Sequence, residues 1–214
     1  MSRLTSPLRL GDRTAPACLL FGPHVTNLGR ERGLTARHAA YYGRRAQGGA
    51  GIVVTETASV HASDWPYERA PLASSSGPGW AEIAAAVGDA GALAMASLGH
   101  AGGQGSSAYS QAALWAPSPM PMNNDREVPK VMEPADIEAV VAGFADATAR
   151  ARASDMDGVE VNAGQFSLVR QFLSGLTNQR SDAYGEDRAR LLREVLSACR
   201  DALEGGVLGL RLSC

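Results

Sequence analysis

The feature that most constrains this chain is the alternation of five short apolar segments with polar loops and helical segments. The apolar segments are residues 17–21 (ACLLF), 51–56 (GIVVTE), 93–98 (LAMASL), 158–161 (GVEV) and 207–212 (VLGLRL). Continuous apolarity indicates strands that are buried on both faces, as in parallel sheets. The loops that follow these segments are long and polar, whereas those that follow helices are short. This asymmetry is typical of a parallel α/β fold with one functional edge.

Helical segments lie between the apolar ones. Thr35 is the predicted N-cap of a helix that runs to about Gln47, because a hydroxyl can accept a backbone N–H of the first turn. Pro78 and Pro134 are predicted to open the next two helices, since proline is tolerated in a first turn. Residues 7–16 predict a small hairpin ahead of the main fold.

A barrel and a doubly wound sheet both accommodate five such units. No GxGxxG follows the first apolar segment, so the dinucleotide-binding motif of doubly wound folds is missing. The sequence also stops within the fifth apolar segment, as if cut. We therefore expect a (β/α)8 TIM barrel, which needs about 250 residues. Residues 1–214 would be the N-terminal part of that domain, with about the first five strand–helix units. Open edges of a parallel sheet are costly.

Composition excludes several classes of protein. The formal net charge of −2 argues against binding nucleic acid, which usually leaves a basic patch. No apolar run reaches the roughly 20 residues of a membrane span, and no signal peptide is visible, so a cytoplasmic protein is expected. Cys18, Cys199 and Cys214 lie far apart in apolar runs, which indicates buried thiols in a reducing compartment. His24 and His100 lack further ligands, so no metal site is expected.

Polar side chains gather after the fourth apolar segment. Asn162, Gln165 and Ser167 follow it directly, at the strand end where barrels build their active sites. Further along the same loop, Arg180 and Asp182 are expected to form an ion pair that pins the loop.

Three charged residues interrupt or end apolar segments. Glu56 and Glu160 are buried carboxylates that need partners, and nearby arginines are the expected ones. Arg211 lies inside the last apolar segment and also needs a partner.

Eight stretches of the sequence resemble one known family. They are LTSPLRLGDRTAP, AAYYGRRAQGGAGIVVTE, LGHAGGQ, WAPSPMP, DGVEVNAGQ, RQFLSGLTNQRSDAYG, EDRARLLREV and GLRLS. They are similar to the N-terminal portion of the old yellow enzymes, which are flavin-dependent oxidoreductases, and most similar to the branch that resembles 2,4-dienoyl-CoA reductase. The resemblance implies an eight-stranded barrel with FMN across the carboxyl ends of its strands. NADH or NADPH would reduce the flavin, and the hydride would pass to an activated alkene or enoyl-type substrate.

The resemblance also implies roles for individual residues. The residues expected to bind the cofactor are Gly22, Pro23, His24, Thr57, Ser97 and Arg211, of which Arg211 would stabilise charge on the reduced flavin. The residues expected in the substrate pocket are Val25, Thr26, His100 and Tyr67. Asn162 and Gln165 match the pair that holds a substrate oxygen, and Ser167 matches the proton donor.

Three departures from the family pattern change the expected chemistry. Ser97 replaces a glutamine that reads the flavin edge, and Ser167 replaces a tyrosine that donates the proton. A serine hydroxyl is a poor acid without a partner. Asn162 and Gln165 replace a histidine-containing pair and cannot titrate. The proton source is left open between His24, His100 and a residue beyond the end of this sequence.

Two alternatives to the alkene reductase follow. One is an FMN dehydrogenase of the same fold that acts on an amine or an alcohol, which requires no tyrosine donor. The other is a truncated, non-catalytic fragment that cannot retain flavin. In the dienoyl-CoA reductase branch an iron–sulfur cluster and a second flavin (FAD) domain follow the barrel, and they would belong to a longer protein. A small-molecule substrate is expected, while its identity, the choice of NADH or NADPH and assembly into a homo-oligomer stay open.

Overall fold

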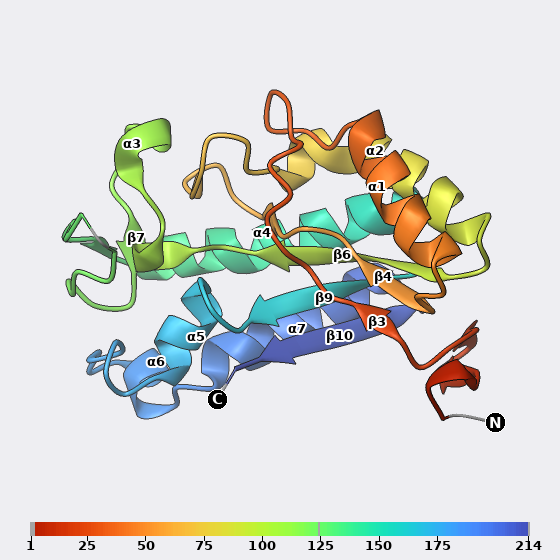
Figure 1. Ribbon diagram of the computed structural model, residues 1–214. Coiled ribbons are helices and arrows are strands. Elements are labelled where there is room, and N and C mark those ends of the chain that lie inside the picture. The colour runs from red at the N-terminus through yellow and green to blue at the C-terminus, as the bar shows by residue number, and fades with distance from the viewer. Residues whose placement is uncertain (1–2, 124, 214) are drawn as a thin grey trace.

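A computed structural model describes residues 3–123 and 125–213 of the chain, and its centre is a parallel sheet (Figure 1). The main strands lie side by side in chain order. They are β3 (Leu20–Phe21), β4 (Ile52–Val54), β6 (Leu93–Gly99), β9 (Gly158–Ala163) and β10 (Val207–Leu212). The short strand β5 (Ala58–Ser59) pairs with the carboxyl end of β6. All five predicted strands are therefore present, and the last has the predicted bounds.

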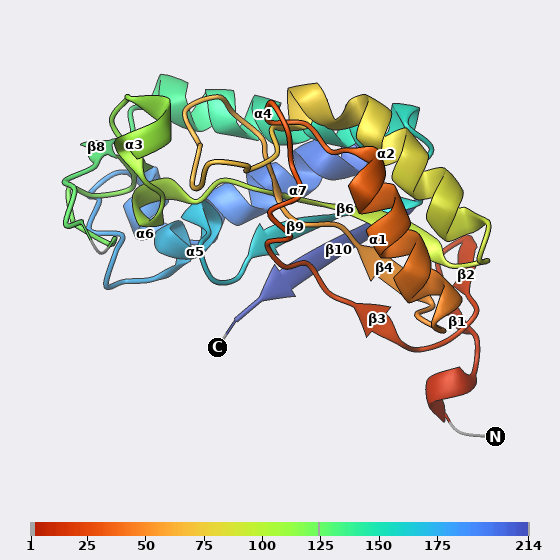
Figure 2. The same cartoon turned by 45° about the horizontal axis from the view of Figure 1, so that its top comes forward.

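Four long helices cover one face of this sheet (Figure 2). They are α1 (Ala36–Gln47), α2 (Ala73–Gly88), α4 (Pro134–Ala153) and α7 (Arg190–Leu203). Each helix packs against the next, so they form one layer that follows the strand order. A doubly wound sheet would reverse its strand order and carry helices on both faces. The arrangement is instead that of a barrel wall, which agrees with the expected architecture.

The remaining elements are short. The N-terminal segment contains η1 (Arg3–Thr5) and the predicted hairpin, whose strands are β1 (Leu8–Leu10) and β2 (Arg13–Ala15). The loops at the carboxyl edge of the sheet contain η2 (Gly102–Gln104), α3 (Ser107–Ser110), β7 (Trp115–Ala116), β8 (Lys130–Val131), α5 (Leu168–Leu173) and α6 (Ala183–Glu186).

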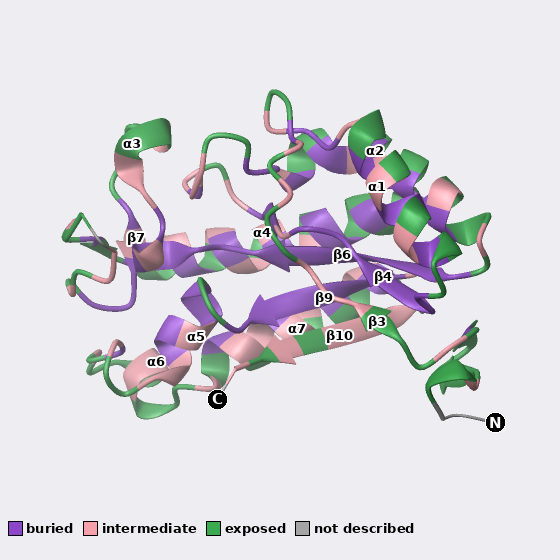
Figure 3. Ribbon diagram, in the orientation of Figure 1, coloured by how far each residue is buried: buried purple, intermediate pink, exposed green. Residues whose placement is uncertain are grey.

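The two faces of the sheet are packed differently. On the helix side, strand residues such as Val53 and Val159 join the main core, and the central strands β4, β6 and β9 are buried along their length (Figure 3). On the other side, Leu93 and Met95 pack with Ala15 of the hairpin in a second, smaller core. Because side chains alternate along a strand, the next positions on this inner face are polar, beginning with Ser97. The inner face thus changes from apolar to polar toward the carboxyl edge.

Two local expectations need correction. The first strand was expected to be buried on both faces, but β3 is an edge strand and Leu20 is 50% exposed. Pro78 does not open its helix, because α2 begins at Ala73 and includes the proline in its second turn. Here the burial of Ala73, Ser76 and Trp80 overrides the weak helix propensity of a Ser/Gly-rich segment.

The cysteines differ in their surroundings. Cys199 is buried in the main core, as expected, whereas Cys18 is exposed, which corrects the expectation for that residue. Cys214 lies outside the described residues. Within residues 3–123 and 125–213, no helix is both long and apolar enough to cross a membrane. The same residues contain no cluster of three or more His, Cys, Asp or Glu side chains suited to a metal ion.

Candidate active site

A cavity of about 350 Å³ opens at the carboxyl edge of the sheet. Its lining comes from the ends of the strands and from the loops that follow them. The lining residues are Pro23, His24, Val25, Thr57, Ser59, Asp64, Pro66, Tyr67, Gly99, His100, Ala101, Asn162, Gly164, Gln165, Phe166, Arg211, Leu212 and Ser213. This edge is where barrel folds place their active sites.

Most of the residues predicted from the sequence meet at this cavity. Those that line it are Pro23, His24, Val25, Thr57, Tyr67, His100, Asn162, Gln165 and Arg211. Gly22, Thr26, Ser97 and Ser167 do not line it. Gly22 lies beside it, because a Cβ there would be 3.3 Å from Nη2 of Arg211.

Ser97 and Ser167, the two serines that depart from the family pattern, use their hydroxyl groups in hydrogen bonds within the protein. Ser97 is fully buried, and its Oγ lies 2.9 Å from Oγ1 of Thr57. Ser167 is also fully buried and is the N-cap of α5. It donates to the carbonyl of Asn162 over 2.6 Å and accepts the backbone N–H of Arg170. The geometry therefore supports a structural role for Ser167, and its catalytic role stays a prediction.

The two predicted substrate-holding amides differ in freedom. Asn162 lies in β9, and its Oδ1 accepts the backbone N–H of Gly164 over 3.0 Å, so that its amide is oriented. The side-chain amide of Gln165 has no hydrogen-bond partner within the described part of the chain. Phe166, a lining residue that sequence reasoning missed, has φ of +52° and is 63% exposed. Left-handed backbone at a non-glycine residue often marks a functional site.

Arg211 is held by the carboxylate of the neighbouring strand. Its Nε and Nη2 donate to the two carboxylate oxygens of Glu160 over 2.8 and 3.2 Å. The expected arginine partner of Glu160 is confirmed. Because this pairing is bidentate, it fixes the plane of the guanidinium group at the cavity and balances its charge.

His100 has both ring nitrogens engaged within the protein. The backbone N–H of Gly102 donates to Nδ1 over 3.0 Å, so the proton lies on Nε2. That nitrogen is 3.0 Å from Oγ of Ser63, which lies 2.8 Å from Nδ1 of His61. Burial is the main cause that lowers the pKa of both imidazoles, which keeps them neutral. His100 therefore has no N–H available for a ligand.

Ser63, His100 and Asp64 are the residue types of a hydrolytic triad. The Asp64 carboxylate is 4.0 Å from Nδ1 of His100 and accepts hydrogen bonds from Ser59 and the backbone of Ala101 instead. A triad needs the carboxylate to accept the Nδ1 proton of the histidine. The geometry therefore does not support hydrolysis by these residues.

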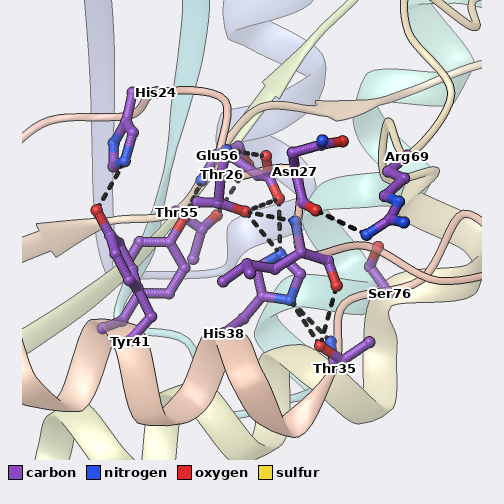
Figure 4. A network of polar contacts seen from close by, with 12 residues as sticks. His24, Thr26, Asn27, Thr35, His38, Tyr41, Thr55, Glu56, Arg69 and Ser76 are labelled. Atoms are coloured by element: carbon purple, nitrogen blue, oxygen red, sulfur yellow. Dashed lines mark hydrogen bonds and ion pairs between the residues drawn. The ribbon is translucent and has the colours of Figure 1, made fainter.

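His24 keeps one ring nitrogen free. Its Nε2 lies 2.8 Å from the hydroxyl of Tyr41 (Figure 4), and its Nδ1 has no partner among residues 3–123 and 125–213. The guanidinium of Arg45 lies 3.5 Å from the centre of the Tyr41 ring, a cation–π contact that holds the tyrosine. Of the two histidines at the cavity, His24 is thus the one that can exchange a proton with a ligand.

A buried polar network behind the cavity was missed by the sequence reasoning (Figure 4). Glu56 was expected to pair with an arginine, but its partner is His38, whose Nε2 lies 2.6 Å from Oε1. Thr26 adds its hydroxyl and its backbone N–H, at 2.7 and 2.8 Å, and Tyr67 adds its hydroxyl at 3.3 Å. One feature of the sequence could have predicted that His38 is held at this place. It is the third residue of α1, where its side chain closes a capping box with Thr35.

The long loop after β9 is pinned as predicted. Arg180 forms an ion pair with Asp182 and donates to the carbonyls of Pro117 and Met132 over 3.3 and 2.7 Å. These bonds fix the loop against the segment around β7 and β8, outside the cavity.

Comparison with known proteins places the cavity in context. A profile described as the NADH:flavin oxidoreductase / NADH oxidase family matches residues 3–214. A metal reductase of Desulforamulus reducens is 34% identical over 207 residues, which cover 95% of this chain and 31% of that protein.

Two solved structures extend the likeness to the fold. An old yellow enzyme homologue from Zymomonas mobilis has a TM-score of 0.89 and 27% identity, covering 99% of this chain and 63% of that one. Histamine dehydrogenase from Rhizobium sp. 4-9 has a TM-score of 0.88 and 27% identity, covering 99% of this chain and 34% of that one. The chain spans less than two thirds of each of these three proteins.

Proposed function

Because the chain belongs to the NADH:flavin oxidoreductase / NADH oxidase family, we propose that it supplies the flavin-binding wall of an NADH- or NADPH-dependent oxidoreductase. In this proposal residues 1–214 are the N-terminal part of an FMN-binding TIM barrel. The observation that carries it is the inner face of the sheet, which ends in Thr57, Asn162 and Arg211 around one cavity. The old yellow enzyme homologue supports the barrel, since its chain matches 99% of this one.

The residues at the cavity fit the ring of a flavin. Gly99 has no side chain where a Cβ would be 2.8 Å from Cγ2 of Thr57, so the cavity floor stays open. Arg211 offers fixed N–H donors, and the segment at Pro23 and His24 forms a second wall. FMN, when bound, would accept a hydride from the nicotinamide and pass it to the substrate. Arg211 would stabilise the negative charge that this chemistry places on the ring.

The remaining polar groups would hold the substrate and supply its proton. The amides of Asn162 and Gln165 would donate hydrogen bonds to a substrate oxygen without titrating. Ser167 is committed to its cap, and His100 has no free N–H. His24 therefore takes the role of proton donor in this proposal, with Tyr41 behind it as a positioning residue.

Two substrate classes fit this arrangement. An enoyl-type alkene, as expected for the dienoyl-CoA reductase-like branch, would need the proton from His24. An amine or alcohol would instead give up a hydride to the flavin and need no donor at the Ser167 position. The likeness to histamine dehydrogenase and the structural role of Ser167 favour keeping this second candidate.

The first test is retention of the cofactor. The purified chain is mixed with FMN, excess flavin is removed, and the absorbance spectrum is recorded. A retained flavin band supports the proposal, and Arg211→Ala should weaken it. Arg193→Ala is the matched control, because Arg193 forms an exposed ion pair with Asp187 and does not line the cavity. Absence of the band in the unsubstituted chain means that these residues do not hold flavin by themselves, as the non-catalytic alternative requires.

The second test separates the substrate classes by the direction of electron flow. With oxygen excluded, an amine or alcohol substrate bleaches the flavin band without added nicotinamide. An alkene substrate instead restores the band after NADH or NADPH has bleached it. If neither occurs with a panel of both classes, the assignment of hydride transfer to this cavity is wrong.

A further inference from the structure

One wall of the cavity rests on a buried carboxylate. Glu56 is fully buried, and its two oxygens accept the four hydrogen bonds from His38, Thr26 and Tyr67 described above. Tyr67 lines the cavity, and so does Val25, the neighbour of Thr26. Glu56 therefore ties the Thr26 loop to helix α1 through His38 (Figure 4), and its bond from Tyr67 ties a second cavity-lining loop to the same carboxylate.

The histidine in this network is neutral. The backbone N–H of Thr35 points at Nδ1 of His38 over 2.9 Å. A backbone N–H can only donate, so Nδ1 carries a lone pair and the ring proton lies on Nε2. Nε2 then donates to Glu56, and the imidazole brings no positive charge to the carboxylate.

Glu56 is therefore a buried anion without a cationic partner. No lysine or arginine contacts it within the described part of the chain. Burial is the largest single influence and raises the pKa of its carboxyl, the hydrogen bonds from His38 and Thr26 lower it, and the net shift is downward. All four groups that contact its oxygens donate, which is how a buried carboxylate stays ionised.

The carboxylate determines the hydrogen-bonding character of Tyr67. Because the tyrosine hydroxyl gives its only proton to Glu56, its oxygen can only accept a second hydrogen bond. Burial and the adjacent carboxylate raise the pKa of Tyr67 strongly, so it stays a phenol.

We propose that Tyr67 is a specificity-determining residue that selects ligands with a hydrogen-bond donor, and that Glu56 is the residue that positions it. The donor is the hydrogen of a hydroxyl, amine or ammonium group. The inference rests on the proposed function only in treating this cavity as the ligand-binding one. A ligand group that offers only lone pairs cannot pair with the oxygen of Tyr67.

The test uses a pair of probes, benzyl alcohol and benzyl methyl ether, in which a methyl group replaces the donor hydrogen. Their binding to the full chain is measured by ligand-observed NMR, with and without FMN. The expected preference for the alcohol is about two- to tenfold, the value of one hydrogen bond. Equal affinities, or no measurable binding of either probe, overturn the proposal.

Three variants locate the preference. Tyr67→Phe should abolish it. Tyr184→Phe should leave it intact, because that hydroxyl also donates to a glutamate, Glu194 over 2.9 Å, but Tyr184 does not line this cavity. Glu56→Gln should weaken or invert the preference, since the amide can donate to the tyrosine oxygen and turn its proton toward the ligand. A preference that survives Tyr67→Phe overturns the proposal.

A measurement on the unsubstituted chain covers the case in which Glu56→Gln does not fold. Nitrogen-15 NMR of the histidine rings should show His38 neutral, with its proton on Nε2, near neutral pH. An imidazolium signal for His38 would overturn the proposal, because Glu56 would then have a cationic partner. Failure of the proposed function has a different signature: no FMN is retained while the probe preference persists.

Discussion

The contribution of His38 to stability can be divided into two hydrogen bonds, and two substitutions separate them. Asparagine places an amide oxygen near the position of Nδ1, so His38→Asn keeps an acceptor for the Thr35 N–H and loses the bond to Glu56. Glutamine places an amide nitrogen near the position of Nε2, so His38→Gln keeps the bond to Glu56 and loses the acceptor. The imidazole is fully buried, so water replaces neither bond.

The expected magnitudes differ between the two variants. A hydrogen bond to a charged group contributes about 1.5–3 kcal/mol, and His38→Asn should lower the free energy of unfolding by about that amount at pH 7. Loss of the capping interaction costs about 1 kcal/mol, which is the expected effect of His38→Gln. Urea-induced unfolding followed by tryptophan fluorescence measures both, with Arg37→Gln, an exposed neighbour on α1, as the control.

The pH dependence tests the charge of Glu56 directly. In the unfolded chain its carboxyl titrates near 4.5, and in the folded chain its pKa is lower. A depressed folded pKa gives stability that is present above the unfolded value and lost as pH falls through the folded value. The part of the stability difference between the unsubstituted chain and His38→Asn that comes from Glu56 should therefore shrink as the pH falls below 4.5. Equal losses in the two variants, or a difference unchanged in acid, would refute the reasoning.

Three further predictions concern other parts of the molecule. Gly79→Ala should destabilise the chain by about 1–3 kcal/mol, because the new Cβ would overlap Leu34. Gly88→Ala lies at an open position of the same helix and should leave the stability unchanged or raise it by up to about 1 kcal/mol. Equal effects of the two substitutions in thermal melts would contradict this reasoning. Arg180→Ala should cost about 2–3 kcal/mol, because it removes bonds to two carbonyls, while Arg193→Ala, a surface ion pair, should cost less than about 1 kcal/mol; the same denaturation assay compares them. In a Cys214→Ser background, a thiol reagent should label Cys18 in the native chain and Cys199 only after unfolding. Cys199 is protected because it is buried, and burial raises the pKa of its thiol to about 11. Rapid labelling of both cysteines in the native chain would contradict the core described above.

The position of the candidate site at the carboxyl edge of the sheet could be predicted from the sequence to a considerable extent. Apolar segments followed by long polar loops placed the chemistry at one sheet edge, and nine of the thirteen predicted residues line the cavity there. The pairs Arg211–Glu160 and Arg180–Asp182 were also predictable. Each joins neighbouring strands or nearby positions of one loop, so few alternatives competed.

The hydrogen-bond partners of single polar residues could not be predicted in the same way. Ser97 and Ser167 were expected at the ligand, yet their hydroxyls bond to Thr57 and to the backbone of Asn162. Glu56 was expected to meet an arginine and meets His38 instead. In each case the nearest partner in the fold, more than the residue type, decided what the side chain does.

By itself, the sequence determined the order of strands and helices, the edge that carries the site and the type of cofactor chemistry to expect. The first two properties follow from hydrophobic periodicity and loop length, which are local along the chain, and the cofactor chemistry was implied by the resemblance to a known family. Only the tertiary structure decided which hydroxyl groups are free, which histidine keeps a nitrogen for a ligand and which carboxylate lies uncompensated behind the cavity. A hydrogen bond depends on distances of about 3 Å between groups far apart in sequence, and only the packing of helices on the sheet sets such distances.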